Sequence, residues 1–388
     1  MTAPELILLQ LARTRSGVAF GETSLIRCRF ARAENEFNTM TQNENLFSFP
    51  TLTARGSVGN WAVLIVGIVS LLGSALRAQE SGINAAPVNT VIGTVNVGSE
   101  PFGVVVSPNN QFVYAANYGG ASVSVIDAAT NTVQTTISVD RNPAELAISS
   151  DGSKLYVTNE KAPGTVTVVD LANGNSTHTI TGLGTNPYGV ALTPDGKQLW
   201  VANSGGNTVN VIDTSNHSVV SSIVVGTRPA FIAFTPDGEK AYVTCNHRVF
   251  VINAARRTVK TSIQVGNLPL GIAITPTGTT AYIVDFHTFT DSGTALVIDT
   301  ATDTLIKTIK LGSSAPGERP ALLPNGRYLY YPESEVGGVA LISTTTNSVV
   351  NDGFACAQPG DIAISPDGTH AYVTDAIDDI VTVVQISQ

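Results

Sequence analysis

Carboxylate residues interrupt a repeated amide pattern in the second half of the chain. An aromatic residue recurs along the sequence, and the residue three positions after it is, in chain order, Asn117, Asn159, Asn203, Cys245, Asp285, Glu333 and Asp375. Such side chains often bond nearby backbone groups, so this column could simply close each repeat. The last three members are carboxylates, however, and carboxylates held on one surface could also bind a cation.

Further acidic residues are expected on the same face, and we take Asp361, at the entry of the seventh repeat, and Asp379 as candidate binding residues with them. Oxygen ligands suit a hard cation such as calcium. No Asp-x-Asp-x-Asp-Gly loop supports a calcium site, and a solvated acidic rim is the simpler interpretation. The sequence therefore predicts no required cofactor, with calcium as the ion to test.

Histidines and arginines near the same loops are the remaining candidates. His247 and His287 occupy equivalent loops of adjacent repeats, where they could form a metal pair or place a base near Asp285, although exposed loop histidines without a role are commoner. Arg228 and Arg319 precede two predicted strands. They could bind a carboxylate or phosphate, or pair with the neighbouring acids.

The repeat itself predicts the elements that position these residues. The aromatic column Tyr114, Tyr156, Trp200, Tyr242, Tyr282, Tyr330 and Tyr372 recurs every 40 to 48 residues. Within one copy, residues 183–225, four short runs rich in Val, Ile and Thr are separated by turn residues such as Pro-Asp-Gly. Four such strands make one antiparallel blade, and a period of this length is typical of a propeller.

The ring is predicted to close through its two ends. The seventh copy supplies three strands, and residues 89–97 match the outer strand of the first copy, residues 131–139. We therefore expect residues 89–97 to pair with residues 380–386. The sequence thus predicts an all-β fold, a seven-bladed propeller of four-stranded antiparallel blades. In such a ring, loops leaving second strands and loops entering first strands rim the same mouth of the channel.

One tetrad connects the chain to a known family. Residues 156–159 read Tyr-Val-Thr-Asn, residues 200–203 and 372–375 are near copies, and residues 365–368 form the accompanying Ser-Pro-Asp-Gly turn. Over residues 89–388 the chain resembles bacterial and archaeal YVTN β-propeller repeat proteins. That resemblance implies a protein outside the cytoplasm, often in a surface layer. Some family members resemble lactonase propellers or the haem-binding propeller of nitrite reductase, so no single activity follows.

The composition of the chain disfavours nucleic acid as a binding partner. The net charge is −9 and only 13% of residues are charged, so broad binding to nucleic acid phosphates is disfavoured. Cys245 and Cys356 fall in blades that are not neighbours, and we expect buried free thiols. Motifs for covalent haem attachment, zinc hydrolysis and a serine nucleophile elbow are absent from the sequence.

The N-terminal region is predicted to direct export. Residues 61–72 are an apolar run after Arg55, and small residues follow up to position 78. Such a run is typical of a cleaved secretory signal and short for a membrane span, although an uncleaved anchor is the alternative. Residues 1–60 then form an unstructured leader, of which 1–39 could be a mis-assigned start before Met40. Residues 79–88 form a linker, and 89–388 the propeller.

These observations favour a secreted or periplasmic binding module. We expect a monomer that binds a small molecule, cation or protein at the channel mouth, with no membrane contact beyond the signal or anchor segment. The alternative is a lactonase- or hydrolase-like enzyme at the same mouth, which would need Asp285, His287 and Arg228 to converge. A haem or redox partner domain is a third, weaker alternative.

Overall fold

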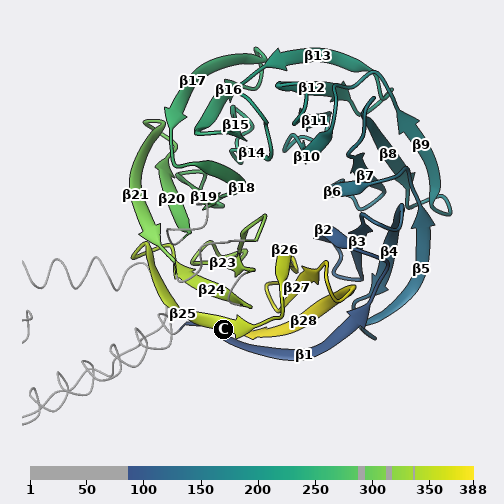
Figure 1. The fold of residues 1–388 in the computed structure, drawn as a ribbon, viewed down its shortest axis with the longest axis vertical. Helices are drawn as coiled ribbons and strands as arrows, with labels where there is room; N and C mark the ends of the chain where they lie inside the picture. Colours follow the sequence, from purple (N-terminus) through teal and green to yellow (C-terminus); the bar gives the residue numbers. More distant parts are fainter. Residues whose placement is uncertain (1–85, 287–292, 312–316, 335–336) are drawn as a thin grey trace, which may run out of the picture. The chain divides into compact units, whose positions relative to one another are not determined.

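The computed structural model describes residues 86–286, 293–311, 317–334 and 337–388. These residues form one compact unit that begins at Ala86. Figure 1 shows the unit as a ring of seven four-stranded blades around a central channel. Within this part of the chain every named element is a β-strand, and no helix has the length and apolar character that a membrane crossing needs.

The first four blades follow one another along the chain without interruption. Blade 1 consists of β2 (Pro101–Val106), β3 (Phe112–Asn117), β4 (Ser122–Asp127) and β5 (Thr132–Ser138). Blade 2 consists of β6 (Pro143–Ile148), β7 (Lys154–Asn159), β8 (Thr165–Asp170) and β9 (Ser176–Ile180). Blade 3 consists of β10 (Pro187–Leu192), β11 (Gln198–Asn203), β12 (Thr208–Asp213) and β13 (Val219–Val224). Blade 4 consists of β14 (Ile232–Phe234), β15 (Lys240–Cys245), β16 (Arg248–Asn253) and β17 (Thr258–Gln264).

The last three blades complete the ring. Blade 5 consists of β18 (Leu268–Ile274), β19 (Thr280–Phe286), β20 (Thr294–Asp299) and β21 (Thr304–Lys310). Blade 6 consists of β22 (Ala321–Leu322), β23 (Tyr328–Glu333), β24 (Gly338–Ser343) and β25 (Ser348–Ala355). Blade 7 consists of β26 (Pro359–Ile364), β27 (His370–Asp375), β28 (Ile380–Ser387) and β1 (Val88–Asn96).

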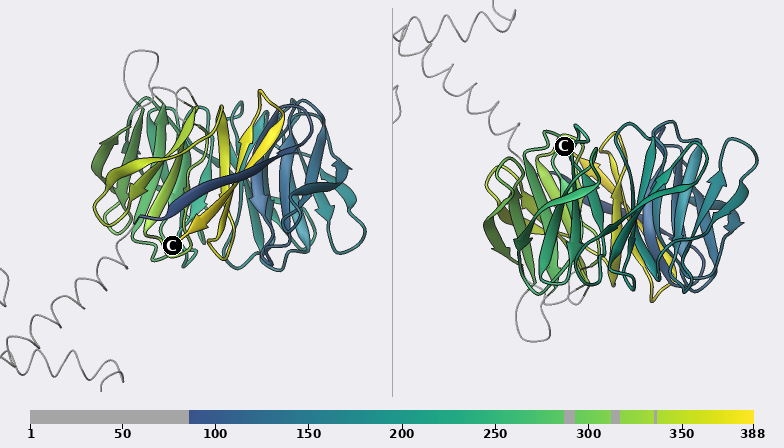
Figure 2. Two further views of the ribbon diagram at one scale, coloured as in Figure 1. Left: turned by 90° about the horizontal axis from the view of Figure 1, so that it is seen from below. Right: turned by 90° about the horizontal axis from the view of Figure 1, so that it is seen from above.

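Strand β1 closes the ring as the sequence predicts. It pairs antiparallel with β28, from Val88 opposite Ser387 to Asn96 opposite Ile380. The strand begins one residue before the expected boundary, and Figure 2 shows it crossing the outside of the ring beside β28. Strand β28 therefore has a partner on both sides, because it also pairs with β27. The predicted seven-bladed architecture and its N-terminal closing strand are confirmed.

Hydrophobic clusters lie between neighbouring blades. One cluster, for example, joins Tyr114 and Val125 of blade 1 to Leu155 and Val157 of blade 2. Each blade thereby covers the sheet face that its neighbour would otherwise expose to water, which is what stabilises a stack of blades. Cys245 and Cys356 belong to two such clusters and are free, buried thiols, as predicted.

The aromatic column also connects one blade to the next through its hydroxyl groups. Tyr242 of blade 4 donates a hydrogen bond to Asp303 Oδ1 in a turn of blade 5, at 2.5 Å. Tyr330 of blade 6 donates to Asn89 Oδ1 in the closing strand β1, at 2.6 Å. Buried tyrosines need such partners for their hydroxyl groups, so the column contributes both apolar area and specific links between blades.

Candidate functional site

A β-bulge marks the start of the first strand in several blades. In blade 3, Pro187 pairs with Asn203 but Val190 pairs with Val201, so Tyr188 and Gly189 face a single residue of β11. The same register shift occurs in blades 1, 2, 5 and 7. A bulge bends its strand and redirects the extra side chain. These bulges lie at the channel mouth, which is the end of the ring where first strands begin and second strands end.

The two bulge positions, and the equivalent residues of blades 4 and 6, form two columns around the channel. The residue after the leading Pro or Gly is Phe102, Ala144, Tyr188, Ala230, Leu270, Glu318 or Gly360. The next residue is Gly103, Glu145, Gly189, Phe231, Gly271, Arg319 or Asp361. The glycines allow close approach of the neighbouring strand, because a Cβ on Gly189 would lie 2.1 Å from the carbonyl oxygen of Ala230. Charged residues occupy the same columns in blades 2, 6 and 7.

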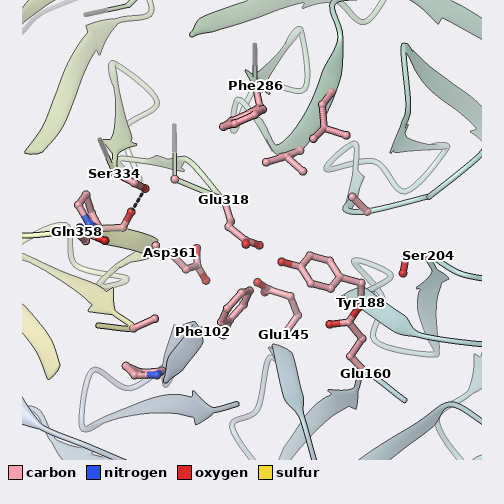
Figure 3. Close-up of a pocket in the computed structure, with 18 of the residues that line it drawn as sticks. Phe102, Glu145, Glu160, Tyr188, Ser204, Phe286, Glu318, Ser334, Gln358 and Asp361 are labelled. Atoms are coloured by element: carbon pink, nitrogen blue, oxygen red, sulfur yellow. Dashed lines mark hydrogen bonds between the residues drawn. The ribbon is translucent and has the colours of Figure 1, made fainter. Parts of the chain in front are cut away.

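A cavity of about 560 Å³ opens at this mouth. Figure 3 shows side chains from several blades converging on it. Its apolar lining includes Phe102, Tyr188, Leu268, Leu270, Phe286 and Ile377. Its carboxyl groups belong to Glu145, Glu160, Glu318 and Asp361, and Arg228 adds a guanidinium group. Cavities that bind small molecules commonly combine apolar walls and a few polar groups at volumes of roughly 300–1,000 Å³.

Aromatic rings form one wall of the cavity. The ring of Phe102 lies 5.3 Å from that of Tyr118 and meets Tyr188 edge-on at 6.4 Å, measured between centroids. Tyr188 in turn meets Phe231 edge-on at 5.5 Å. Such contacts hold large side chains in fixed orientations. Phe102 of blade 1 and Tyr188 of blade 3 therefore form this wall, and the rings of Tyr118 and Phe231 support them.

Arg319 connects four blades through the second column. Its Nη1 lies 3.0 Å from Glu145 Oε2 in blade 2, and its Nε lies 3.4 Å from Asp361 Oδ1 in blade 7. Asp361 Oδ2 also accepts a hydrogen bond from the backbone N–H of Val104 in blade 1, at 3.0 Å. Glu145 and Asp361 are only 1% and 2% exposed. A buried ion pair is stabilised only when additional hydrogen bonds satisfy its remaining polar atoms. Asp361 accepts such a bond from the backbone N–H of Ile362, whereas Glu145 Oε1 has no donor among the described residues.

The cavity carboxyl groups hold protons more tightly than ordinary carboxyl groups. Burial raises the pKa of Glu318 to about 8, and Asp361 and Glu160 add to the effect. Burial, and then the charge of Asp361, raise the pKa of Glu145 well above its usual value. Burial also raises the pKa of Glu160 and of Asp361, the latter against the opposing effect of Arg319. Desolvation penalises the charged form of each group.

Two oxygen atoms in this group have no hydrogen-bond donor. Glu145 Oε1 and Glu318 Oε2 are both inaccessible to solvent and lack a partner among the described residues. Figure 3 shows both carboxyl groups directed into the cavity, with Asp361 beside them and the ring of Tyr188 opposite. Buried polar atoms are nearly always paired, so each of these oxygens indicates a place for a donor from outside the protein.

Three of the sequence candidates come together at the cavity. Asp361 lines it, Arg228 lines it on the opposite arc, and Arg319 holds Asp361 in place. The alternative that the arginines pair with nearby acids is thus confirmed for Arg319.

The carboxylate column lies in the surrounding loops instead. Asp285 is fully buried, and its Oδ1 accepts the backbone N–H groups of Asn267 and Leu268, at 2.9 and 3.0 Å. Asp375 accepts backbone N–H groups of Gln358 and Ile377 in the same way, at 2.9 and 3.0 Å. The interpretation that this column closes the repeats is confirmed for these two residues. A further role in binding stays a prediction.

The other candidates are more scattered. Glu333 is buried at the end of β23, and Asp379 accepts the backbone N–H of Glu100 at 2.7 Å. His247 is exposed in the turn between β15 and β16, with φ of 61°. His287 lies outside the described residues. Asp285 and Arg228 do not converge on one point, since Arg228 is exposed and lines the cavity whereas the Asp285 carboxylate serves its loop.

Sequence reasoning missed Glu145, Glu160 and Glu318 and the aromatic wall. An alignment of the first strands on their leading Pro would have shown Glu145 and Asp361 in one column, because both follow Pro by two residues. The alternation of apolar and polar residues along the first strands did not predict which side chains face the channel, because the bulge places two consecutive side chains there. Among the described residues, no group of three His, Cys, Asp or Glu side chains is arranged to hold a metal ion.

The comparisons with known proteins agree with this architecture. Residues 142–318 match the family model of the YNCE-like beta-propeller. The Kuenenia stuttgartiensis Hydrazine Synthase has a similar fold, with a TM-score of 0.68 and 23% identity, over 74% of this chain and 96% of that chain. At this identity the likeness shows the fold alone. No curated protein matches the sequence. This chain is therefore a β-propeller whose residues 142–318 are similar to YNCE-like propellers, a kind related to the YVTN-repeat propellers that the sequence resembles.

Proposed function

We propose that this protein is a binding module that takes up a small molecule in the cavity at its channel mouth. The observation that carries the proposal is the combination of rigid apolar walls with two buried carboxyl oxygens that lack a donor, Glu145 Oε1 and Glu318 Oε2. A ligand that fills the cavity would bury apolar area and supply the missing hydrogen bonds, and both effects favour binding.

The proposed setting is outside the cytoplasm. Its support is the apolar run at residues 61–72 with the small residues after it, which lies outside the described part of the chain. A ligand-binding propeller exported in this way would meet its ligand in the periplasm, in the medium or at the cell surface.

Filling the cavity tests the proposal. Leu270 lines the cavity, so Leu270→Trp should occupy part of its volume and lower the affinity for any small molecule that copurifies with the native protein. Mass analysis of the extracted protein identifies that molecule, and titration of both variants with it measures the affinity. Leu305→Trp is the matched control, because Leu305 is an exposed residue of the outer strand β21.

The two variants separate the possible outcomes. Ten-fold or greater weakening in Leu270→Trp, with no change in Leu305→Trp, would support the cavity as the site. Equal affinity of both variants for the copurified molecule would overturn the proposal, because the ligand would then bind elsewhere.

A further inference from the structure

The charges around the cavity are unbalanced toward the negative side. Four carboxyl groups, those of Glu145, Glu160, Glu318 and Asp361, stand against two guanidinium groups, of which Arg228 is exposed to solvent and Arg319 is shared between Glu145 and Asp361. Full ionisation would therefore leave two negative charges in excess. Buried like charges repel one another unless a proton or a cation offsets them.

The unpaired oxygens indicate the kind of group that a ligand would bring. Glu145 is 1% exposed, its Oε2 contacts Arg319, and its Oε1 has no donor among the described residues. Glu318 Oε2, from blade 6, is likewise inaccessible to solvent and has no donor among the described residues. Carboxylate oxygens accept hydrogen bonds, and an N–H of a charged amine forms a stronger bond with them than a neutral donor does.

The walls indicate what carries that group. Phe102, Tyr188, Leu270 and Phe286 present carbon surface to the cavity, which a bare metal ion would not use. An ammonium group beside aromatic rings gains a further attraction to their faces. We propose that the cavity recognises an organic ammonium ion, a primary or secondary amine on an apolar body, with its N–H groups on Glu145 and Glu318. This inference rests on the proposed function and specifies its ligand class.

Binding of such a cation should release a proton from the Glu318 carboxyl group. At pH 7 most of the Glu318 carboxyl is protonated, because burial raises its pKa to about 8. The charged groups that share the cavity with it are Glu145, Glu160, Asp361 and Arg228, with Arg319 next to it in the chain. An ammonium ion placed on Glu318 favours its charged form, so the carboxyl loses its proton to the solvent as the amine binds.

Calorimetry on the full chain tests the ligand class. The probes are phenethylamine and hexylamine, with 2-phenylethanol as the neutral counterpart of the first and calcium chloride as the metal. We expect at least one amine to bind ten-fold or more tightly than the alcohol. Titration in two buffers of different ionisation enthalpy should show release approaching one proton per amine at pH 7.

Matched Glu→Gln variants locate the effect. Glu318→Gln should weaken amine binding about ten-fold or more and lower the proton release, because the amide cannot ionise. Glu239→Gln makes the same substitution in an exposed turn after β14, at the opposite end of the ring, and should change neither quantity. Thermal melts of both variants verify that they fold.

The outcomes distinguish this inference from the proposed function. If the alcohol binds as tightly as phenethylamine, or if calcium displaces the amine, the ligand class is wrong. The same holds if neither amine binds at millimolar concentration. In each of these cases the proposed function still stands if Leu270→Trp lowers the affinity for the copurified molecule. If Leu270→Trp leaves that affinity unchanged, both the proposed function and the ligand class are wrong.

Discussion

At the scale of single residues, Glu318 connects the cavity to the stability of the ring. Its pKa is raised from the usual value of 4.5 to about 8, so its contribution to stability is fully present below pH 4.5 and is lost as the pH rises through 8. Glu318→Gln cannot ionise and escapes this loss. We therefore expect the variant to gain stability over the native protein between pH 5 and pH 9, by up to a few kcal/mol.

Thermal melting of both proteins across that pH range measures the gain. The difference between variant and native melting temperatures cancels the titration of groups outside the cavity, such as Asp151, whose pKa is lowered to about 2 by its turn hydrogen bonds. A difference that is the same at pH 5 and pH 9 would show that Glu318 ionises as freely in the folded ring as in the unfolded chain.

Arg319 is the residue on which the buried carboxylates Glu145 and Asp361 depend. Removing one partner of a buried ion pair leaves an uncompensated charge and typically costs about 3–5 kcal/mol. Arg319→Met should therefore lower the free energy of unfolding by about that amount at pH 7 in denaturant titrations. The deficit should shrink toward pH 5, because the two carboxyls can then take up protons and lose their charge.

A matched substitution separates this effect from a general loss of positive charge. Arg256→Met removes a guanidinium from an exposed turn after β16 and should change stability by less than about 0.5 kcal/mol. An Arg319→Met protein as stable as Arg256→Met at pH 7 would contradict the importance of the bridge.

Residue types alone indicated part of the site. Asp361, Arg228 and Arg319 were candidates because acids and arginines beside a channel mouth can bind ligands, and all three lie at or next to the cavity. Asp285 and Asp375 have the same residue type and the same predicted position, but they accept hydrogen bonds from backbone N–H groups in their loops. An aspartate that binds and an aspartate that closes a loop have the same chemistry in a sequence, and only their neighbours in space distinguish them.

At the scale of elements, the Thr of the tetrad explains how a bulge can be buried. The bulge leaves the N–H of Glu145 without a ladder partner, and Thr158 Oγ1 accepts it at 3.0 Å while donating to the carbonyl of Tyr188 in the next blade, at 2.6 Å. Thr374 serves Asp361 and Phe102 identically, at 3.0 and 2.8 Å. The sequence showed the tetrad, but the role of its Thr depends on the bulge in the neighbouring strand.

Thr158→Val tests that role because it keeps the shape and removes the hydroxyl. The buried N–H of Glu145 then has no acceptor, which should cost about 1–3 kcal/mol in denaturant unfolding. Thr135→Val, on the exposed face of β5, makes the same change where no buried group depends on it and should be nearly neutral or slightly stabilising. Equal stabilities of the two variants would mean that the bulge does not need the hydroxyl.

At the scale of the whole molecule, the repeat made the fold predictable. Seven copies of one pattern specify blade number, strand order and turns, because each blade buries its faces only against its neighbours. The cavity could not be predicted in the same way. It arises where the copies differ, as at Glu145, Arg319 and Asp361, and those differences combine only after blades 2, 6 and 7 meet across the channel.

The leader segment gives a prediction about processing. The apolar run at residues 61–72 and the small residues up to 78 predict cleavage that leaves a mature chain starting between Gln79 and Asn84, or at Leu76 for an earlier site. N-terminal sequencing of protein recovered from the exported fraction measures the start. A mature chain that retains residues 1–60 would contradict export by this signal.

Ring closure gives the last prediction. Strand β1 pairs with β28 over eight residues, buries Val95 against Val381 and Val383, and accepts the Tyr330 hydroxyl on Asn89. Deletion through Val97 removes all of these and exposes the edge of β28, which can pair with another chain. We expect the melting temperature to fall by roughly 10 °C or more and the protein to aggregate. Deletion through Ala85, which keeps β1, is the matched control and should melt like the intact propeller. A peptide of residues 86–97 added to the shorter protein should restore part of the lost stability, because the missing strand can still fill its place in blade 7. A protein deleted through Val97 that stays monomeric and melts with the control would show that the ring does not depend on this strand.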